Sequence, residues 1–223
     1  MVGWEDWNYK DGQESGEAWS KPWGGSENQW KVQVLPRISS FIPTSTILEI
    51  APGYGRWTKF LIQQCDHLIG VDINKYTVED CKEKFKDHSA EFYVNDGSSL
   101  GMVIDNTIDF CFSFDSMVHV NEEVLRSYIN QLRSKLKRDG IGFIHHSNQN
   151  SQGGRIESVG PRLVKELVEQ SGMRCLTQES IPWHGGFKDC ITVFTKHGSS
   201  WPNRYLYIES SSDNFLTGLY QKQ

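Results

Sequence analysis

The chain lacks the features that would direct it to a membrane or to nucleic acid. Its 223 residues contain no apolar run that approaches the ~18 residues a membrane span needs. Positive charge is not in excess, since 23 Lys and Arg stand against 28 Asp and Glu, a formal net charge of −5. Binding to a phosphate backbone requires a basic surface, so no nucleic-acid partner is expected. The first residues show no basic stretch followed by an apolar one, so no secretory signal is expected.

Cysteine is scarce and irregularly placed. The chain has five cysteines, an odd number, and no C-x-x-C pair. This pattern argues against a disulfide framework and against a structural zinc site. The sequence therefore predicts a protein of a reducing compartment, the cytoplasm. The cysteines are Cys65, Cys81, Cys111, Cys175 and Cys190.

Tryptophan, in contrast, is abundant and crowded at one end. Five of the eight tryptophans lie in the first thirty residues: Trp4, Trp7, Trp19, Trp23 and Trp30. Composition divides the chain into a Trp-rich segment over 1–40, a central region over 41–197 and a polar, Ser-rich extension over 198–223.

The central region alternates short apolar runs with longer amphipathic stretches. Strands separated by helices of this length predict right-handed crossovers and a largely parallel sheet. The sequence thus predicts an α/β, doubly wound, Rossmann-like fold with seven mostly parallel strands and an antiparallel hairpin at the C-terminal edge. The expected strands are 46–51, 67–72, 91–94, 108–113, 140–145, 176–181 and 190–194, and the expected helices are 56–64, 78–86, 124–136 and 161–171.

A glycine-rich turn follows the first predicted strand. In such sheets ligands bind beyond the carboxyl ends of the strands, so the residues there are the candidates for a site. The turn reads Glu49-Ile50-Ala51-Pro52-Gly53-Tyr54-Gly55. A dinucleotide-binding G-x-G-x-x-G motif aligned on Gly53 would place Ala51 and Arg56 at glycine positions, so it fails twice. An acid followed by a small-x-Gly-x-Gly pattern remains.

Acidic residues also end the next two strands. Asp72 follows the second strand, where a carboxylate can accept hydrogen bonds from ribose hydroxyls, and Asp96 follows the third, beside Gly97. Three acids at three successive strand ends favour an adenosine that carries a positive centre over a pyrophosphate. The alternative is that Asp72 and Asp96 are ordinary turn or helix-capping residues.

Together these motifs resemble the class I S-adenosylmethionine (SAM)-dependent methyltransferases, and the resemblance covers roughly residues 41 to 197. Ala51 departs from the family pattern, in which glycine is commoner. The resemblance implies SAM as cofactor, with Phe114 and Asp115 bordering the transferable methyl group. The cofactor-binding residues that it implies, with Trp30 added from the N-terminal segment, are Glu49, Ala51, Gly53, Gly55, Arg56, Asp72, Ile73, Asp96, Gly97, Phe114 and Trp30.

More narrowly, three stretches resemble a group of small bacterial methyltransferases associated with glycan or natural-product modification. They are Ile47–Leu61, Phe112–Val120 and Gly142–Asn148. This resemblance implies the reaction type more firmly than the acceptor.

Three histidines are candidates for the base that a hydroxyl or ammonium acceptor needs. His119 follows the fourth strand, and His145 and His146 end the fifth. Because alternate strand residues face opposite ways, only one of that pair is expected to point inward, and His146 is slightly favoured. Asp115 could orient a histidine. A metal held by Asp115, His119 and His146 is the alternative, but no dense ligand motif supports it, so no metal is expected.

The leading hypothesis is a methyltransferase that acts on a small molecule, most simply a sugar or glycan-type hydroxyl. The alternatives are N-methylation of an amino sugar or another amine, and a non-catalytic cofactor-binding scaffold subunit. Residues 1–40 are predicted to form a lid over the cofactor cleft, because aromatic faces stack on sugars and attract cations. Trp23 and Trp30 are expected to contact ligand more readily than Trp4 and Trp7.

Overall fold

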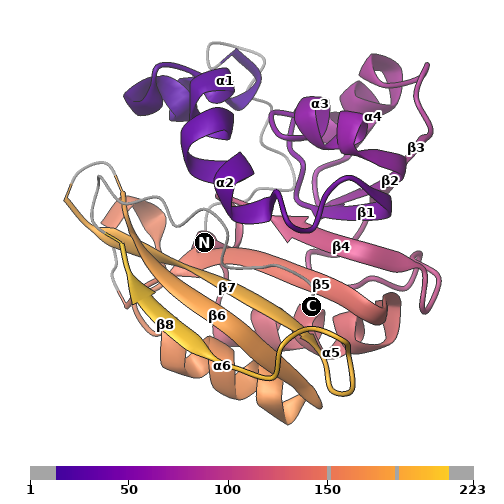
Figure 1. Cartoon of the computed structure of the whole chain (residues 1–223). Coiled ribbons are helices and arrows are strands. Elements are labelled where there is room, and N and C mark those ends of the chain that lie inside the picture. The colour runs from indigo at the N-terminus through magenta and orange to yellow at the C-terminus, as the bar shows by residue number, and fades with distance from the viewer. Residues whose placement is uncertain (1–13, 150–151, 184–185, 211–223) are drawn as a thin grey trace. The chain divides into compact units, whose positions relative to one another are not determined.

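The computed structural model describes residues 14–149, 152–183 and 186–210 (Figure 1). The chain divides into two compact units, with the boundary between Gly97 and Ser98. The described residues contain eight strands, one more than the seven predicted. No helix among them is long and apolar enough to cross a membrane.

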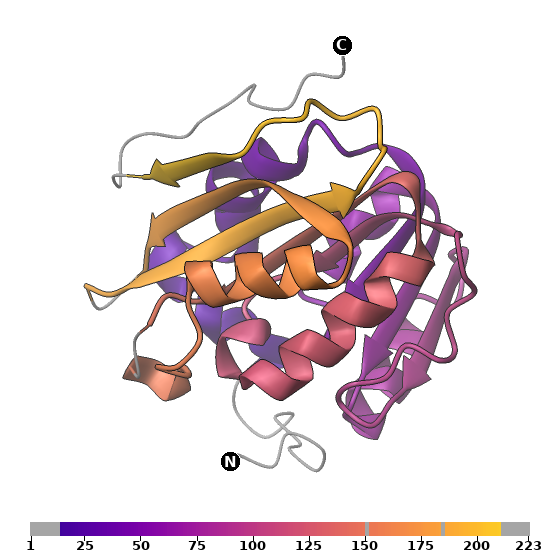
Figure 2. The same ribbon diagram turned by 90° about the horizontal axis from the view of Figure 1, so that it is seen from below.

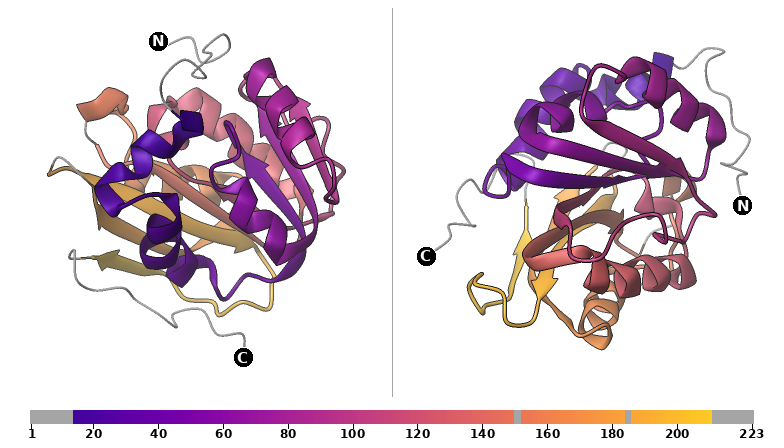
Figure 3. Two further views of the ribbon diagram at one scale, coloured as in Figure 1. Left: turned by 90° about the horizontal axis from the view of Figure 1, so that it is seen from above. Right: turned by 90° about the vertical axis from the view of Figure 1, so that its right-hand side faces the viewer.

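The N-terminal unit holds a parallel sheet of three strands in the order β3-β2-β1. Ile47, Leu48 and Ile50 are buried in near succession, as expected for a parallel strand covered on both faces. Helix α4 packs on β2 and β3 (Figure 3). It begins at Asn74, whose side chain accepts hydrogen bonds from the N–H groups of Tyr76 and Thr77. The elements are β1 (Thr44–Ile50), α3 (Thr58–Leu61), η3 (Ile62–Gln64), β2 (Cys65–Asp72), α4 (Lys75–Lys84) and β3 (Ala90–Val94).

The segment that precedes β1 is helical. Trp30, Val34 and Ile38 recur at a spacing of four residues and are buried, which gives this segment an apolar face. Its elements are the 3-10 helix η1 (Glu14–Trp23), α1 (Ser26–Gln29), the π-helical turn η2 (Trp30–Val34) and α2 (Leu35–Ile38).

The C-terminal unit holds five strands in the order β4-β5-β7-β6-β8. Strands β4 and β5 are parallel, and the buried ring of Phe143 on β5 packs against the buried rings of Phe110 and Phe112 on β4. Helix α5 begins at Asn121, which accepts the N–H of Val124, and carries acids in its first turn and bases in its last. The elements here are β4 (Ile108–Ser113), η4 (Met117–His119), α5 (Glu122–Lys135) and β5 (Leu136–Ser147).

The predicted antiparallel hairpin is β6 (Met173–Pro182) with β7 (Lys188–Lys196), and β7 also runs antiparallel to β5. The hairpin is not the last pair, because β8 (Leu206–Glu209) adds to β6 in parallel. Helix α6 (Pro161–Gln170) lies beside α5, and both cover one face of these strands (Figure 2). A short 3-10 turn, η5 (Gln152–Gly154), precedes α6.

Candidate functional site

The glycine-rich turn after β1 has a left-handed backbone at three positions. Ala51, Gly53 and Gly55 have φ angles of 60°, 57° and 79°. Glycine adopts this region without strain, whereas an alanine there costs about 1–2 kcal/mol. The departure of Ala51 from the family pattern therefore stores strain in the turn.

The two glycines of the turn differ in what surrounds them. A Cβ on Gly55 would lie 2.7 Å from the ring of Phe85, so close packing excludes a side chain. A Cβ on Gly53 would meet no heavy atom of the described residues within 4 Å. Gly55 is thus required by packing, while Gly53 presents its backbone toward open space.

Asp72, at the end of β2, fixes this turn. Its Oδ2 accepts the N–H of Gly53 at 2.9 Å, and its Oδ1 accepts the N–H of Asn74 at 2.9 Å. Burial raises the pKa of the Asp72 carboxyl, and the hydrogen bonds from the Asn74 and Gly53 N–H groups oppose that rise. The structure therefore shows the turn role that the sequence left open for Asp72, and the predicted ribose contact stays a prediction.

Glu49 lies in the same unit, near the end of β1 and two residues before Ala51. It is 1% exposed, and the hydroxyl of Thr58 donates to its Oε2 at 2.6 Å. Burial raises the pKa of Glu49 to about 8, and the negative charge of Asp72 adds to the rise. Glu49 is thus a buried acid whose charged form would be favoured by an added cation.

Arg56 and Trp30 connect the N-terminal helical segment to this turn. The Arg56 guanidinium lies over the rings of Trp57 and Trp19, at 4.7 and 5.5 Å from their centroids, and its Nη1 donates to Ser20 Oγ at 3.2 Å. Trp30 stacks on Phe60 at 4.9 Å. Trp30 is buried and Trp23 is half-buried, so packing within the protein covers most of the surface of the Trp30 side chain. Trp4 and Trp7 fall outside the described residues.

Three further predicted cofactor residues follow β2 and β3. Gly97 has a φ of 83°, and a Cβ there would lie 2.7 Å from Ile73 Cδ1, so Ile73 and Gly97 are in close contact. The neighbouring Asp96 is exposed. The N-terminal unit therefore brings Gly53, Asp72, Ile73 and Gly97 to the carboxyl ends of its parallel strands.

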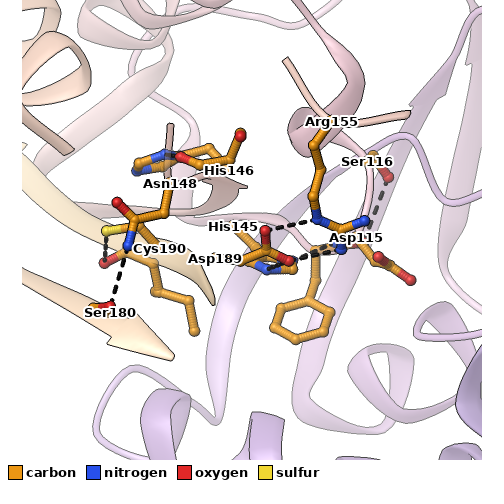
Figure 4. Close-up of polar contacts among 12 residues, drawn as sticks. Asp115, Ser116, His145, His146, Asn148, Arg155, Ser180, Asp189 and Cys190 are labelled. Atoms are coloured by element: carbon orange, nitrogen blue, oxygen red, sulfur yellow. Dashed lines mark hydrogen bonds and ion pairs between the residues drawn. The ribbon is translucent and has the colours of Figure 1, made fainter. Parts of the chain in front are cut away.

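In the C-terminal unit, Phe114 and Asp115 follow β4. The Phe114 ring stacks on the imidazole of His145 with centroids 4.5 Å apart. Asp115 has a φ of 65°, and its N–H donates to His145 Nδ1 at 3.0 Å (Figure 4). Of the two adjacent histidines, His145 is thus the one that reaches the residues after β4.

His146 points away from that contact. Its Nδ1 and Nε2 lie 2.8 Å from Ser147 O and 2.7 Å from Thr192 Oγ1, and the residue is fully buried. Burial lowers the pKa of His146 to about 4. The two rings point in different directions, as predicted. Both ring nitrogens of His146 have protein partners, so this arrangement does not support His146 as the pocket residue.

His119, in η4, keeps a tautomer suited to a base. Its Nδ1 lies 3.0 Å from the carbonyl oxygen of Gly154. A carbonyl can only accept, so Nδ1 carries the proton and the lone pair of the neutral ring is on Nε2. His119 is half-buried.

Sequence reasoning missed two charged residues of the C-terminal unit. Asp189 of β7 and Arg155 form two hydrogen bonds of 2.7 Å, and both residues are buried. Burial alone would raise the pKa of Asp189, but the imidazole of His145 and the guanidinium of Arg155 outweigh it and lower the pKa to about 2. A lone acid in an otherwise apolar strand was the available signal. Within the described part of the chain, no group of three or more His, Cys, Asp or Glu is placed to hold a metal ion.

Comparisons with known proteins identify this arrangement. Residues 47–140 match the family model of a methyltransferase domain. Among solved structures, the chain is similar to a TehB-like SAM-dependent methyltransferase from Corynebacterium glutamicum, with a TM-score of 0.54 and 21% identity over 68% of this chain and 80% of that one. Residues 47–140 thus match a methyltransferase domain, and the chain shares the fold of SAM-dependent methyltransferases.

Further relatives agree on the fold of the methyltransferase. A SAM-dependent methyltransferase from Leishmania major has a TM-score of 0.64 and 16% identity over 79% of this chain and 76% of that one. These structures confirm the predicted α/β Rossmann-like class. A curated relative, phosphoethanolamine N-methyltransferase 1 of Triticum aestivum, is 26% identical over 59% of this chain. The chain matches only 28% of that relative's length.

The residues of the methyltransferase fit its cofactor, SAM, a cationic adenosine derivative. A buried acid, Glu49, lies beside the turn, where burial has raised the pKa of its carboxyl. Gly53 presents backbone without a neighbouring side chain among the described residues. A cation next to Glu49 would compensate the charge that burial disfavours.

Proposed function

We propose that this methyltransferase transfers the methyl group of SAM to the nitrogen of a small polar amine. The observation that carries the choice of acceptor is the similarity to phosphoethanolamine N-methyltransferases of Triticum aestivum, 26% identical over 141 and 137 residues. The mildly acidic chain also favours a small molecule over nucleic acid.

The cofactor-binding residues of the proposal lie in the N-terminal unit. Glu49 faces the positive centre, the backbone at Gly53 and Gly55 carries the methionine part, and Asp72, with Asp96 and Gly97, holds the adenosine. When bound, SAM supplies an electrophilic methyl group whose bond to sulfur breaks as the bond to the acceptor nitrogen forms. Asp72 is already held by two backbone N–H groups, so it is preorganised for this role.

His119 is the base of the proposal. An ammonium acceptor must lose a proton before its lone pair can attack, and the proton passes to His119 Nε2, which carries the lone pair in the tautomer fixed by Gly154 O. His145 is less suited to this role because its Nδ1 accepts the N–H of Asp115, and His146 because it is fully buried, which lowers its pKa to about 4.

A sugar or glycan-type hydroxyl is the second candidate acceptor. The Trp-rich N-terminal segment supports it, because indole faces stack on sugar rings, and Trp23 is half-buried rather than buried. In this proposal residues 1–40 form the lid, 41–197 the methyltransferase core and 198–223 an extension. The five free cysteine thiols support a cytoplasmic location.

The test has a binding arm and a turnover arm. Titration calorimetry with S-adenosylhomocysteine should show that Asp72→Ala weakens binding at least ~10-fold, the loss expected for hydrogen bonds to a charged group. Methyl transfer from labelled SAM is then measured on phosphoethanolamine and on a panel of amino sugars and sugars. We expect methylated amine, and His119→Gln should lower kcat about 10²-fold or more while His88→Gln, an exposed control, leaves it unchanged.

Methylation of sugars alone would overturn the amine proposal and support the hydroxyl. Full activity of His119→Gln would remove His119 as the base. Unchanged binding in Asp72→Ala would remove Asp72 from the cofactor site.

A further inference from the structure

Asp115 adopts a backbone conformation that needs external support. It has a φ of 65° although it is not a glycine, and such conformations persist only where the surroundings fix them. One support is its own N–H, which donates to His145 Nδ1 at 3.0 Å. Asp115 follows the carboxyl end of β4, the edge at which α/β folds bind their ligands.

The acceptor of that hydrogen bond is itself held in one tautomer. Because Nδ1 accepts an N–H, the ring proton of neutral His145 is on Nε2. Nε2 lies 3.2 Å from Asp189 Oδ2. The imidazole is fully buried and packs against Phe114 and Trp183, whose ring centroids are 4.5 and 4.7 Å from its own.

Asp189 is fixed in turn by Arg155. Two hydrogen bonds of 2.7 Å join Arg155 Nε and Nη2 to the two carboxylate oxygens. The guanidinium lies over the rings of Phe187 and Trp183, at 4.4 and 5.4 Å from their centroids. Figure 4 shows the resulting series of contacts, from Arg155 through Asp189 and His145 to Asp115.

This arrangement leaves His145 without a lone pair for a substrate. Nδ1 accepts from Asp115, and Nε2, which carries the ring proton, lies 3.2 Å from Asp189 Oδ2. A general base needs a free lone pair within reach of the proton that it removes. His145 therefore serves the site through another residue.

We propose that His145 is a positioning residue. Asp189 and Arg155 hold its imidazole, and its Nδ1 fixes the backbone of Asp115 in the conformation that the methyl acceptor meets. The part that concerns the acceptor rests on the proposed function, whereas the part that concerns Asp115 does not. Asp189 and Arg155 act on the reaction only through His145.

Two amide variants separate the roles of the two ring nitrogens. The side-chain oxygen of an asparagine can take the place of Nδ1, so His145→Asn keeps an acceptor for the Asp115 N–H and loses the contact to Asp189. His145→Gln does the opposite, because its amide reaches the position of Nε2. A purely stabilising role would depend on Asp189 and would favour His145→Gln.

The first readout needs no acceptor molecule. In the wild-type chain, long-range proton–nitrogen NMR should place the ring proton of His145 on Nε2. Amide exchange at Asp115 should be at least ~10-fold faster in His145→Gln than in the wild type, and within ~3-fold of the wild type in His145→Asn, once exchange is compared with global stability. S-adenosylhomocysteine affinity should differ less between the two variants than the exchange rate does.

The second readout is kcat/KM for the methyl acceptor, measured in the wild type and in both variants. We expect kcat/KM for the acceptor to fall ~10-fold in His145→Gln, the effect of one lost hydrogen bond, and to be rescued in His145→Asn. A ring proton on Nδ1 in the wild type, or equal amide exchange at Asp115 in both variants, overturns the positioning role. The first of these measurements uses the wild type, so the proposal can be tested even if neither variant folds well. Absence of methylation by the wild type with the NMR result intact would overturn the proposed function and leave the positioning of Asp115 standing.

Discussion

Two buried carboxylates, one in each unit, have opposite pKa shifts. Glu49 receives a hydrogen bond from a neutral hydroxyl, and its pKa rises to about 8. Asp189 receives two hydrogen bonds from a guanidinium and lies 3.2 Å from an imidazole, and its pKa falls to about 2. Burial acts in the same direction on both, so the partners decide the outcome.

The difference separates two uses of a buried acid. Asp189 has its cation inside the protein, which suits a residue that holds others in place. Glu49 has only weaker compensation from Arg56, which suits a residue that awaits a cationic ligand. The variants below test this contrast.

Asp189→Asn should have the largest effect on stability. Removing the charge leaves the buried Arg155 guanidinium uncompensated, which costs about 3–5 kcal/mol in the free energy of unfolding. Urea denaturation measures the change. Glu166→Gln, which breaks the exposed pair with Arg162, is the control and should cost less than ~1 kcal/mol.

The same pair predicts the acid side of the stability profile. Because the pKa of folded Asp189 lies below its unfolded value, its contribution is present above the unfolded pKa of about 3.9 and is lost as the pH falls through about 2. A profile for Asp189→Asn parallel to the wild type below pH ~4 would contradict the strong pairing.

Gly55→Ala should be the next largest change. It adds a Cβ 2.7 Å from the Phe85 ring at a φ of 79°, so strain and overpacking together cost about 3 kcal/mol. Gly53→Ala has only the backbone strain and should cost about 1 kcal/mol. Thermal denaturation of both variants, with S-adenosylhomocysteine affinity alongside, checks the contrast. Equal losses of stability would show that Phe85 yields to the added group.

Glu49→Gln should change the pH dependence of stability more than its value near pH 5. Folded Glu49 binds its proton more tightly than the unfolded chain does, so its burial lowers wild-type stability progressively as the pH rises from about 4.5 to about 8. The neutral amide should remove that decline. Denaturation midpoints measured across this range in both chains test it, and parallel declines would refute the assignment.

Thr58→Val should have the smallest effect, because it removes one hydrogen bond of 2.6 Å without changing the shape of the side chain. The expected cost is about 1 kcal/mol in the free energy of unfolding. The decline in stability attributed to Glu49 should also extend to a higher pH, since the donor that lowers the pKa of folded Glu49 is gone. An unchanged profile would mean that Thr58 contributes nothing to the state of Glu49.

Local pattern was sufficient to predict much of the fold. Continuous apolar runs, with helical spacing between them, predicted β1, β2, β4 and β5. A strand that is buried on both faces has apolar residues in succession instead of alternating apolar and polar ones. Strand β8 was missed, since it lies in a polar, Ser-rich stretch and its residues alternate between half-buried and exposed.

The candidate site was predicted unevenly. Gly53, Asp72 and Gly97 follow strand ends, and parallel strands bring such residues together whatever the details of packing. The pair His145–His146 could be recognised from the sequence, but not the ring that contacts Asp115, because that depends on which neighbours each ring meets. Asp189 and Arg155 are 34 residues apart, and no local pattern joins them.

The sequence by itself determined the class of the fold and the glycine-rich turn, because these follow from periodicity and from residues close together in the chain, and its resemblance to a known family implied the cofactor. Only the tertiary structure decided that burial leaves Glu49 short of a cation, that Asp189 has one, and that His145 rather than His146 holds Asp115. Charge state and hydrogen-bond partners depend on burial and on contacts between distant residues, and the order of residues along the chain does not specify them.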